Sequence, residues 1–135
     1  MNRFKTGRRV LFGDCDPAGI VYTPRVSHFV VEAGLEFLDH RFGGSATRQL
    51  FRAGIAPPAR ALSMEFLHPM RWDDLLDIEV HVARLGNTSV TLECRGTVNG
   101  ITTFTATMTM AFVNTETMSS TKIPESVRAQ LTEPD

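Results

Sequence analysis

Two aspartates separated by one residue stand in a turn-forming stretch near the start of the chain. Residues 14–24 read DCDPAGIVYTP, so Asp14 and Asp16 flank a cysteine and precede Pro17 and Gly19. Proline and glycine at this spacing interrupt regular structure and expose the residues beside them. A carboxylate held on such a loop is a candidate for chemistry on a bound ligand.

The residues that follow predict a helix beginning directly behind this loop. Pro24 suits the first helical position, where the N–H that it lacks would have no partner, and Thr23 then falls at the N-cap. Free backbone N–H groups and the positive end of the helix dipole would lie close to Asp16. A carboxylate beside a cradle for an oxyanion suits acyl chemistry. Residues 10–12 are predicted to lead into the loop as a short strand.

Residues 12–22, FGDCDPAGIVY, with a proline two residues later, resemble the signature of the 4-hydroxybenzoyl-CoA thioesterase-like family of hotdog-fold acyl-CoA thioesterases. The resemblance implies that Asp16 is the catalytic carboxylate and that the backbone N–H of Thr23 holds the thioester oxygen. It also implies that the substrate lies along the residues between them, which are Gly19, Ile20, Val21 and Tyr22. The family usually has an aromatic residue where Thr23 stands, so we expect an acyl pocket of different shape here.

The implied reaction is hydrolysis of an acyl-CoA to the free acid and coenzyme A. A thiolate whose conjugate acid has a pKa near ~8.5 leaves without obligatory protonation, so one carboxylate and one oxyanion cradle suffice. Asp16 either attacks the carbonyl to form a mixed anhydride or deprotonates a water molecule, and the sequence leaves both routes open. Hydrolysis needs no cofactor, and none is expected.

The neighbours of Asp16 have other interpretations. We expect Asp14 to be structural and to accept backbone N–H groups. Cys15 lies between two carboxylates, which disfavours the thiolate form. An Asp-x-Asp pair after a strand also occurs in haloacid-dehalogenase-like phosphotransferases and in metal-dependent sugar transferases, but those need a larger parallel α/β scaffold than 135 residues of antiparallel strands provide.

Further candidates lie outside the loop. His28, Glu32 and Glu36 share one helix face, so Glu32 is an alternative catalytic residue, although a solvated face is the commoner role. His68 is expected to be a hydrogen-bonded structural residue. No metal site is predicted, because the histidines and cysteines lack the close spacings of a zinc site. Candidate ligands for coenzyme A phosphates, none preferred, are Arg60, Arg71, Arg84, Arg95 and Lys122.

Hydrophobic periodicity predicts the elements. A period of 3.6 residues over residues 24–40, closed by Gly43-Gly44, predicts one long helix. Asn99-Gly100 is typical of a two-residue hairpin. The remaining predictions are short helices at 46–53 and from 124 to about 131, and alternating strands at 60–66, 76–82, 90–98 and 104–112.

We therefore predict an α+β hotdog fold, with an antiparallel sheet of about five strands in consecutive hairpins curved around one long central helix, as a single domain over residues 1–135. Open sheet edges, and a polar face formed by Thr103, Thr105, Thr107 and Thr109, favour a homodimer or homotetramer. In the resembled family the sheet doubles across a dimer.

Composition limits the partners. The formal net charge is −1, and positive and negative residues are interspersed along the chain. The sequence therefore indicates no basic surface for binding nucleic acid or an anionic membrane. The two cysteines are expected to be free thiols, and no apolar segment approaches a membrane span, so a cytoplasmic location is expected.

Two other function classes remain as alternatives. A hotdog dehydratase or hydratase needs a histidine paired with a carboxylate, and the signature loop contains no histidine. A non-catalytic acyl-binding or assembly module would have no need for a carboxylate next to a thioester.

Overall fold

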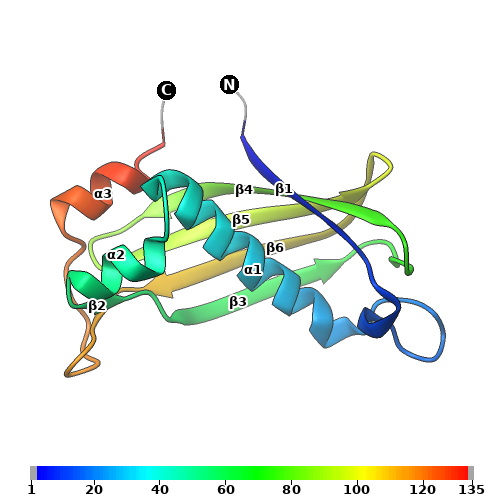
Figure 1. The fold of residues 1–135 in the computed structure, drawn as a ribbon, viewed down its shortest axis with the longest axis horizontal. Helices are drawn as coiled ribbons and strands as arrows, with labels where there is room; N and C mark the ends of the chain where they lie inside the picture. Colours follow the sequence, from blue (N-terminus) through cyan, green and yellow to red (C-terminus); the bar gives the residue numbers. More distant parts are fainter. Residues whose placement is uncertain (1–2, 134–135) are drawn as a thin grey trace.

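A five-stranded antiparallel sheet curves around one long helix in the computed structural model, which describes residues 3–133 (Figure 1). The strand order is β1-β4-β5-β6-β3, and a second sheet pairs β2 with β7. The elements are β1 (Phe4–Arg9), η1 (Phe12–Asp14), α1 (Thr23–Phe42), α2 (Ala46–Arg52), β2 (Ile55–Ala56), β3 (Ala59–Phe66), β4 (Leu75–Leu85), β5 (Ser89–Val98), β6 (Ile101–Ala111), β7 (Val113–Asn114) and α3 (Glu125–Leu131). The α+β prediction is confirmed.

Helix α1 forms because its apolar residues return every three or four positions and face the sheet. Phe29, Ala33 and Phe37 are among the residues buried along this face. Gly43 ends the helix in the left-handed conformation with φ 68°, and its N–H reaches back to the last turn. The predicted long helix and its glycine cap are confirmed.

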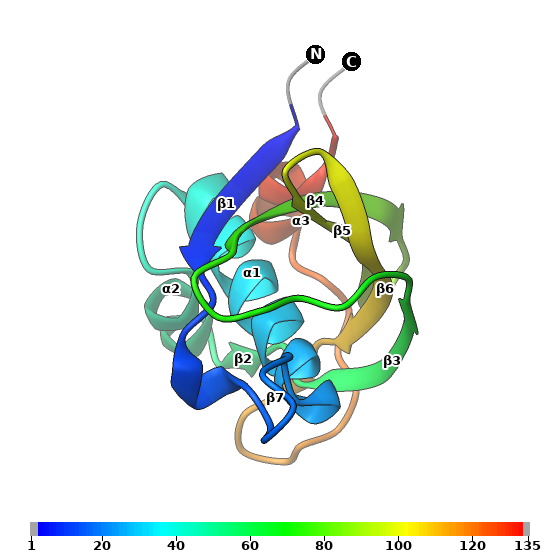
Figure 2. The same cartoon turned by 90° about the vertical axis from the view of Figure 1, so that its right-hand side faces the viewer.

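Strands β4, β5 and β6 form a meander with alternating burial, as predicted. Asn99 and Gly100 both have positive φ, 51° and 77°, as a type I′ turn requires. Figure 2 shows how these strands bend around α1, with β1 on one flank and β3 on the other. The inner face of the curve and α1 enclose the core.

Three details of the prediction are wrong. The leading strand is β1, at Phe4–Arg9, and residues 10–12 lie outside it. The sequence pattern did not indicate this strand, because the inward positions of Thr6 and Arg8 hold polar side chains and break the expected apolar alternation. The hairpins do not include β3, which pairs with β6 at the far edge. Thr103 is buried and donates its hydroxyl to the carbonyl of Gly96, since a register shift after Gly96 turns it away from the polar face.

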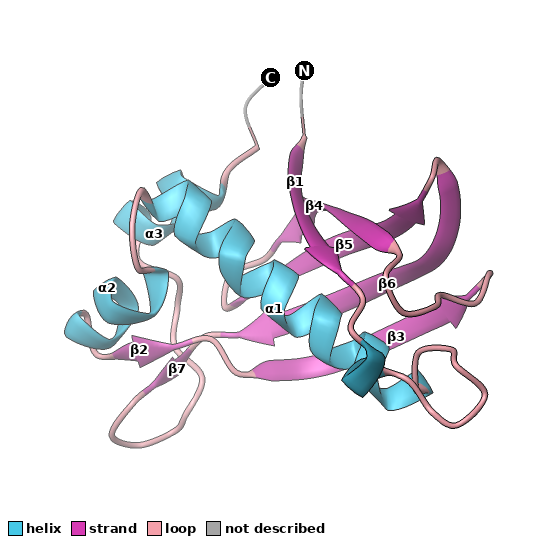
Figure 3. Cartoon of the chain, turned by 45° about the vertical axis from the view of Figure 1, so that its right-hand side comes forward, coloured by secondary structure: helices cyan, strands magenta, loops and turns pink. Residues whose placement is uncertain are grey.

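The elements outside the main sheet gather at one end of α1. In Figure 3, α2, α3 and the β2–β7 pair lie near its C-terminal end, while its N-terminal end meets the loop that follows η1. The candidate loop therefore stands at the end of the helix opposite these elements. No helix within residues 3–133 is long and apolar enough to cross a membrane.

Candidate active site

The loop before α1 is a tight hairpin that fixes the backbone of Asp16. The Gly19 N–H donates to the carbonyl of Asp16 at 2.9 Å, and the Asp16 N–H donates to the carbonyl of Ile20 at 2.9 Å. Gly19 has φ 82°, the left-handed residue that closes a three-residue hairpin. Pro17 supplies the φ that the first turn position needs. The predicted break is therefore an ordered turn with Asp16 at its base.

Asp14 and Asp16 have opposite surroundings. The side chain of Asp14 is only 8% exposed and lies 3.3 Å from Arg8 and 3.6 Å from Arg25. Its carboxylate also accepts the N–H of Leu11 at 2.8 Å. Asp14 is therefore occupied by structural contacts, as predicted.

Asp16 is half-buried, and its carboxylate has one described contact, the N–H of Ala18 at 2.9 Å from Oδ1. No arginine, lysine or histidine between residues 3 and 133 forms an ion pair with it. Its second oxygen therefore has no protein partner in that range. A carboxylate left free in this way is able to accept a proton or attack an electrophile.

Helix α1 begins one residue earlier than predicted. Tyr22 is the N-cap, with φ −64° and ψ 126°, Thr23 is the first helical residue and Pro24 the second. The prediction of Thr23 as N-cap is thus wrong, because Tyr22 rather than Thr23 has the extended backbone of a cap. Placing Pro24 at the first helical position is wrong for the same reason.

The backbone N–H groups around the helix start divide into bonded and free ones. The N–H of Val21 donates to the carbonyl of Met70, and that of Tyr22 to the carbonyl of Asp14. The N–H groups of Ile20 and Thr23 have no acceptor among the described residues. That of Thr23 also lies at the positive end of α1, where a developing negative charge is favoured.

A cavity of about 260 Å³ opens beside the helix start. Its lining is mostly apolar and comes from the signature loop, α1, β6 and the end of β3 with its following loop: Ile20, Val21, Thr23, Val26, Phe66, Leu67, His68, Pro69, Met70 and Thr103. The cavity therefore brings together Ile20 and Val21, two of the four predicted substrate-binding residues, and Thr23, the predicted oxyanion donor. Gly19, Tyr22 and Asp16 are not among the lining residues, although the backbone N–H of Asp16 donates to the carbonyl of Ile20, which does line the cavity.

Sequence reasoning missed the contribution of residues 66–70 to this cavity. They are more than forty positions from Thr23, and β3 reaches the loop region only because it pairs with β6. Of these residues, only His68 was a candidate from the sequence alone. Arg71, a candidate phosphate ligand, borders the loop through a backbone bridge with Ile20.

The carboxylates of Glu32 and Glu36 on α1 contact side chains of strand β1 and do not face the cavity at the helix start. Glu32 contacts Arg8 at 3.0 Å and His28 at 3.1 Å, and Glu36 accepts the hydroxyl of Thr6. Neither Glu32 nor Glu36 lines the cavity at the helix start.

Both cysteines are free, and both thiols favour the protonated form. Burial, followed by the negative charge of Asp14, raises the pKa of Cys15. Burial, with a contribution from Glu93, raises the pKa of Cys94 to about 12. Neither residue has the low pKa of a nucleophilic cysteine.

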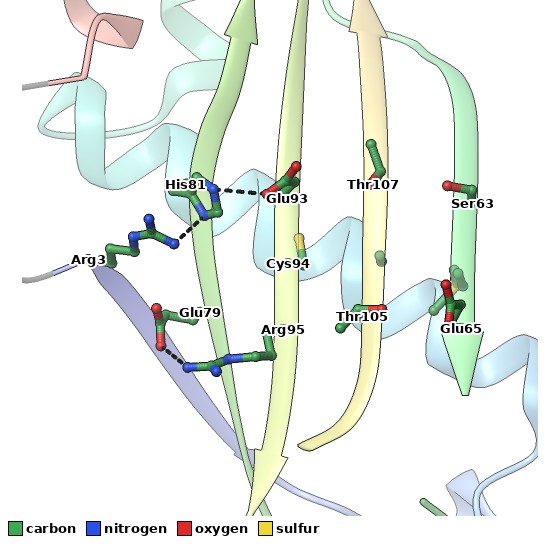
Figure 4. A pocket seen from close by; sticks show the side chains of 12 residues that line it. Arg3, Ser63, Glu65, Glu79, His81, Glu93, Cys94, Arg95, Thr105 and Thr107 are labelled. Atoms are coloured by element: carbon green, nitrogen blue, oxygen red, sulfur yellow. Dashed lines mark hydrogen bonds and ion pairs between the residues drawn. The ribbon is translucent and has the colours of Figure 1, made fainter. Parts of the chain in front are cut away.

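A larger hollow of about 530 Å³ lies over the outer face of the sheet and has no residue of the signature loop. Four of its ionisable side chains pair across adjacent strands: His81 with Glu93 at 3.1 Å, and Arg95 with Glu79 at 3.2 Å (Figure 4). Arg95, a predicted candidate for coenzyme A phosphates, is thus engaged here. Among the described residues, no three metal-binding side chains converge.

Comparison with known proteins identifies relatives that match most of the chain. Residues 10–131 match the family model of the thioesterase-like superfamily. The acyl-CoA thioesterase YbgC of Haemophilus influenzae is 27% identical over 128 residues, covering 95% of this chain and 93% of that protein.

Solved structures agree with this match. A thioesterase-superfamily structure from Jannaschia sp. CCS1 superposes with a TM-score of 0.90 at 29% identity, covering 96% of this chain and 90% of that one. A gentisyl-coenzyme A thioesterase superposes with a TM-score of 0.85 at 27% identity, covering 96% of this chain and 100% of the other.

Proposed function

The chain belongs to the thioesterase-like superfamily, and we propose that it is an acyl-CoA thioesterase that uses Asp16 as its reactive carboxylate. The relatives named for this activity span nearly the whole chain. The enzyme class follows from that kinship, and the assignment of residues rests on the geometry of the loop.

One observation carries the choice of Asp16: of two carboxylates separated by one residue, only one is available. Asp14 is held by two arginines and a backbone N–H. Asp16 keeps an oxygen without a protein partner among residues 3–133, and it stands on the loop whose Ile20 and Val21 line the cavity together with Thr23. Nucleophilic or base chemistry needs an uncommitted carboxylate of this kind.

In the proposed reaction the acyl group occupies the 260 Å³ cavity and the thioester oxygen accepts the Thr23 N–H. If Asp16 is the base, it takes a proton from water, the hydroxide adds to the carbonyl, and the coenzyme A thiolate departs and is then protonated. If Asp16 is the nucleophile, its oxygen attacks the carbonyl, the C–S bond breaks and the coenzyme A thiolate leaves, and water then hydrolyses the mixed anhydride to the free acid and the regenerated Asp16 carboxylate. A single turnover in H₂¹⁸O distinguishes them, because only the nucleophilic route can leave the label in Asp16.

The test of this function is a panel of acyl-CoA esters with a thiol-trapping dye. We expect thiol release from at least one ester, and Asp16→Asn to lower kcat by roughly a hundredfold to ten-thousandfold while folding normally. Asp14→Asn is the matched comparison: it should lower kcat less than Asp16→Asn does and lower stability more, because Asp14 acts on the reaction only by holding the loop.

The outcomes of the panel separate the proposal from its rivals. A dead Asp14 variant together with an active Asp16 variant would reverse the assignment. Because His68 lines the cavity, the panel includes an unsaturated acyl-CoA, and hydration of its double bond without thiol release would favour a hydratase. Binding without turnover would favour an acyl-binding module.

We also propose that the active unit is a homodimer or homotetramer with coenzyme A bound across a subunit boundary. Strand β3 is an open edge and is exposed along nearly its whole length. Leu62 within the strand, Phe66 at its end and Leu67 in the following loop are 40%, 53% and 53% exposed. An unpaired edge with apolar side chains is suited to pairing with a second copy of the chain.

A further inference from the structure

Arg8 links strand β1, the signature loop and helix α1 through three contacts of one guanidinium group. Nη1 lies 3.0 Å from Glu32 of α1, and Nη2 lies 3.3 Å from Asp14 of the loop. The plane of the group lies over the ring of Phe29, 4.0 Å from its centroid. Both terminal nitrogens and one face of the group are thus engaged, whereas Nε is buried without a hydrogen-bond partner among the described residues.

A backbone hydrogen bond connects Asp14 to the start of α1, where the candidate oxyanion donor lies. The carbonyl of Asp14 accepts the N–H of Tyr22 at 3.0 Å, and Tyr22 is directly followed by Thr23. The Asp14 backbone is therefore one of the contacts that hold the start of α1, where the free N–H of Thr23 lies. Asp16, two residues along, is carried by the same segment.

Arg8 is also the stronger of the two cations on Asp14. Arg25 lies 3.6 Å from the Asp14 carboxylate, compared with 3.3 Å for Arg8. The side chain of Arg25 is 43% exposed, and that of Arg8 is 28% exposed. An ion pair screened by solvent holds its partner less firmly. The Asp14 side chain is only 8% exposed. If it loses its closer counter-charge, moving toward water lowers the free energy of the carboxylate, and that movement would displace the loop.

We propose that Arg8 is a positioning residue for the thioesterase reaction: through Asp14 it sets the placement of the Thr23 N–H and of Asp16. This inference rests on the proposed function of that site. Arg8 touches neither the 260 Å³ cavity nor Asp16, so its effect is exerted through the loop.

The test compares Arg8→Met with Arg9→Met in the full-length protein. Arg9 is the next residue along β1 and pairs with Asp73 at the surface, which makes it a matched control. We expect Arg8→Met to lower kcat by about tenfold to a hundredfold with KM changed less than about threefold, the scale of a small misplacement of reacting groups. Arg9→Met should match wild type in both constants.

A double variant tests the route through Asp14. Arg8→Met combined with Asp14→Asn should lower kcat little more than Asp14→Asn alone, because the two residues act as a unit. Multiplied losses, or a kcat for Arg8→Met equal to that of Arg9→Met, would overturn the proposal. If Arg8→Met does not fold, Arg8→Lys replaces it, and a kcat between those of wild type and Asp14→Asn is expected, because an ammonium cannot bridge both carboxylates as the guanidinium group does.

The proposal also has a readout that does not depend on turnover. The backbone amide resonances of Tyr22 and Thr23 should shift in Arg8→Met and stay in place in Arg9→Met. If no acyl-CoA is hydrolysed by the wild-type protein, the proposed function fails, and these resonances alone decide whether Arg8 positions the loop. Unshifted resonances in the Arg8 variant would overturn it.

Discussion

At the scale of single residues, partners rather than residue type decide what a carboxylate does. Asp14 and Asp16 are chemically identical and two positions apart, yet only Asp14 is enclosed by arginines. Breaking a buried ion pair on one side is costly, because the remaining charge stays without compensation. This is why Asp14 is suited to holding the loop and Asp16 to reacting.

A substitution at Val26 tests whether the cavity limits the size of the acyl group that the enzyme accepts. Val26 is buried in the first turns of α1 and lines the 260 Å³ cavity. Val26→Phe should reduce kcat/KM for a benzoyl or octanoyl ester by roughly tenfold to a hundredfold relative to acetyl-CoA, since one methylene too many in an apolar pocket is worth about 1–3 kcal/mol. Steady-state assays over a chain-length series measure this.

The exposed neighbour Val31 on α1 offers the control for that series. Val31→Phe should leave the chain-length preference unchanged. If Val26→Phe folds and keeps the wild-type preference, the acyl group lies elsewhere.

Cys94 makes a prediction about alkaline pH. Its pKa is raised to about 12 in the folded protein, so the unfolded chain loses this proton first as the pH rises. Stability from the neutral thiol is present below about pH 9 and is lost toward pH 12, with a slope of up to about 1.4 kcal/mol per pH unit.

Urea unfolding of the wild-type protein and Cys94→Ala at several pH values measures this slope. The variant should lose stability more gradually above pH 9, because it lacks the titrating thiol. Equal slopes in the two proteins would contradict the assignment.

At the scale of elements, the start of α1 is the feature that joins fold to chemistry. Thr23→Pro removes the free N–H and should lower kcat by roughly a hundredfold to a thousandfold if that group binds the oxyanion. Circular dichroism and sedimentation must show that the variant keeps its fold beside Pro24. An unchanged rate in a folded variant would place the oxyanion on another donor.

Thr23→Ala is the control for this experiment, because it keeps the N–H. Thr23 is not the N-cap, and no described contact uses its hydroxyl, so the substitution should change the unfolding free energy by less than about 0.5 kcal/mol. This is smaller than the loss expected for an N-cap residue.

The elements that could be predicted from the sequence are those whose signals are local. The periodicity of α1, the cap at Gly43 and the Asn99-Gly100 hairpin each depend on a few neighbouring residues. The pairing of β3 with β6 joins residues some forty positions apart, and no local pattern encodes it.

The same limit applied to the candidate site. The loop with Asp16 and Thr23 could be found from its motif, whereas Phe66 and His68 reach the cavity only through the long-range pairing of β3. The contacts of Arg8 were missed because its inward position on β1 interrupts the expected apolar alternation.

At the scale of the whole molecule, the open edge at β3 makes the assembly testable. We expect a sedimentation mass of two or four times the 15.0 kDa chain. Leu62→Lys should shift the protein toward a single chain, because a charge on an edge strand opposes pairing. Ile101→Lys, at the exposed β5–β6 hairpin, is the control and should leave the mass unchanged. A wild-type protein that is monomeric and fully active would contradict the proposal.

We further propose that residues 1–135 form one domain, whose two terminal residues at each end lie outside the described range. Thermal unfolding followed by fluorescence and by circular dichroism should then give coincident single transitions. Two separated transitions would indicate independent units.

The strand order has a consequence for synthesis on the ribosome. Strands β1 and β3 are synthesised before their partners β4 and β6. Phe4 therefore cannot pair with Val80, nor Phe66 with Phe104, until the later strands have been made. The β4–β6 meander closes only short loops and is the part that can assemble first. Until these strands have been made, no sheet is available to cover the apolar face of α1, although the helix is translated before most of the sheet.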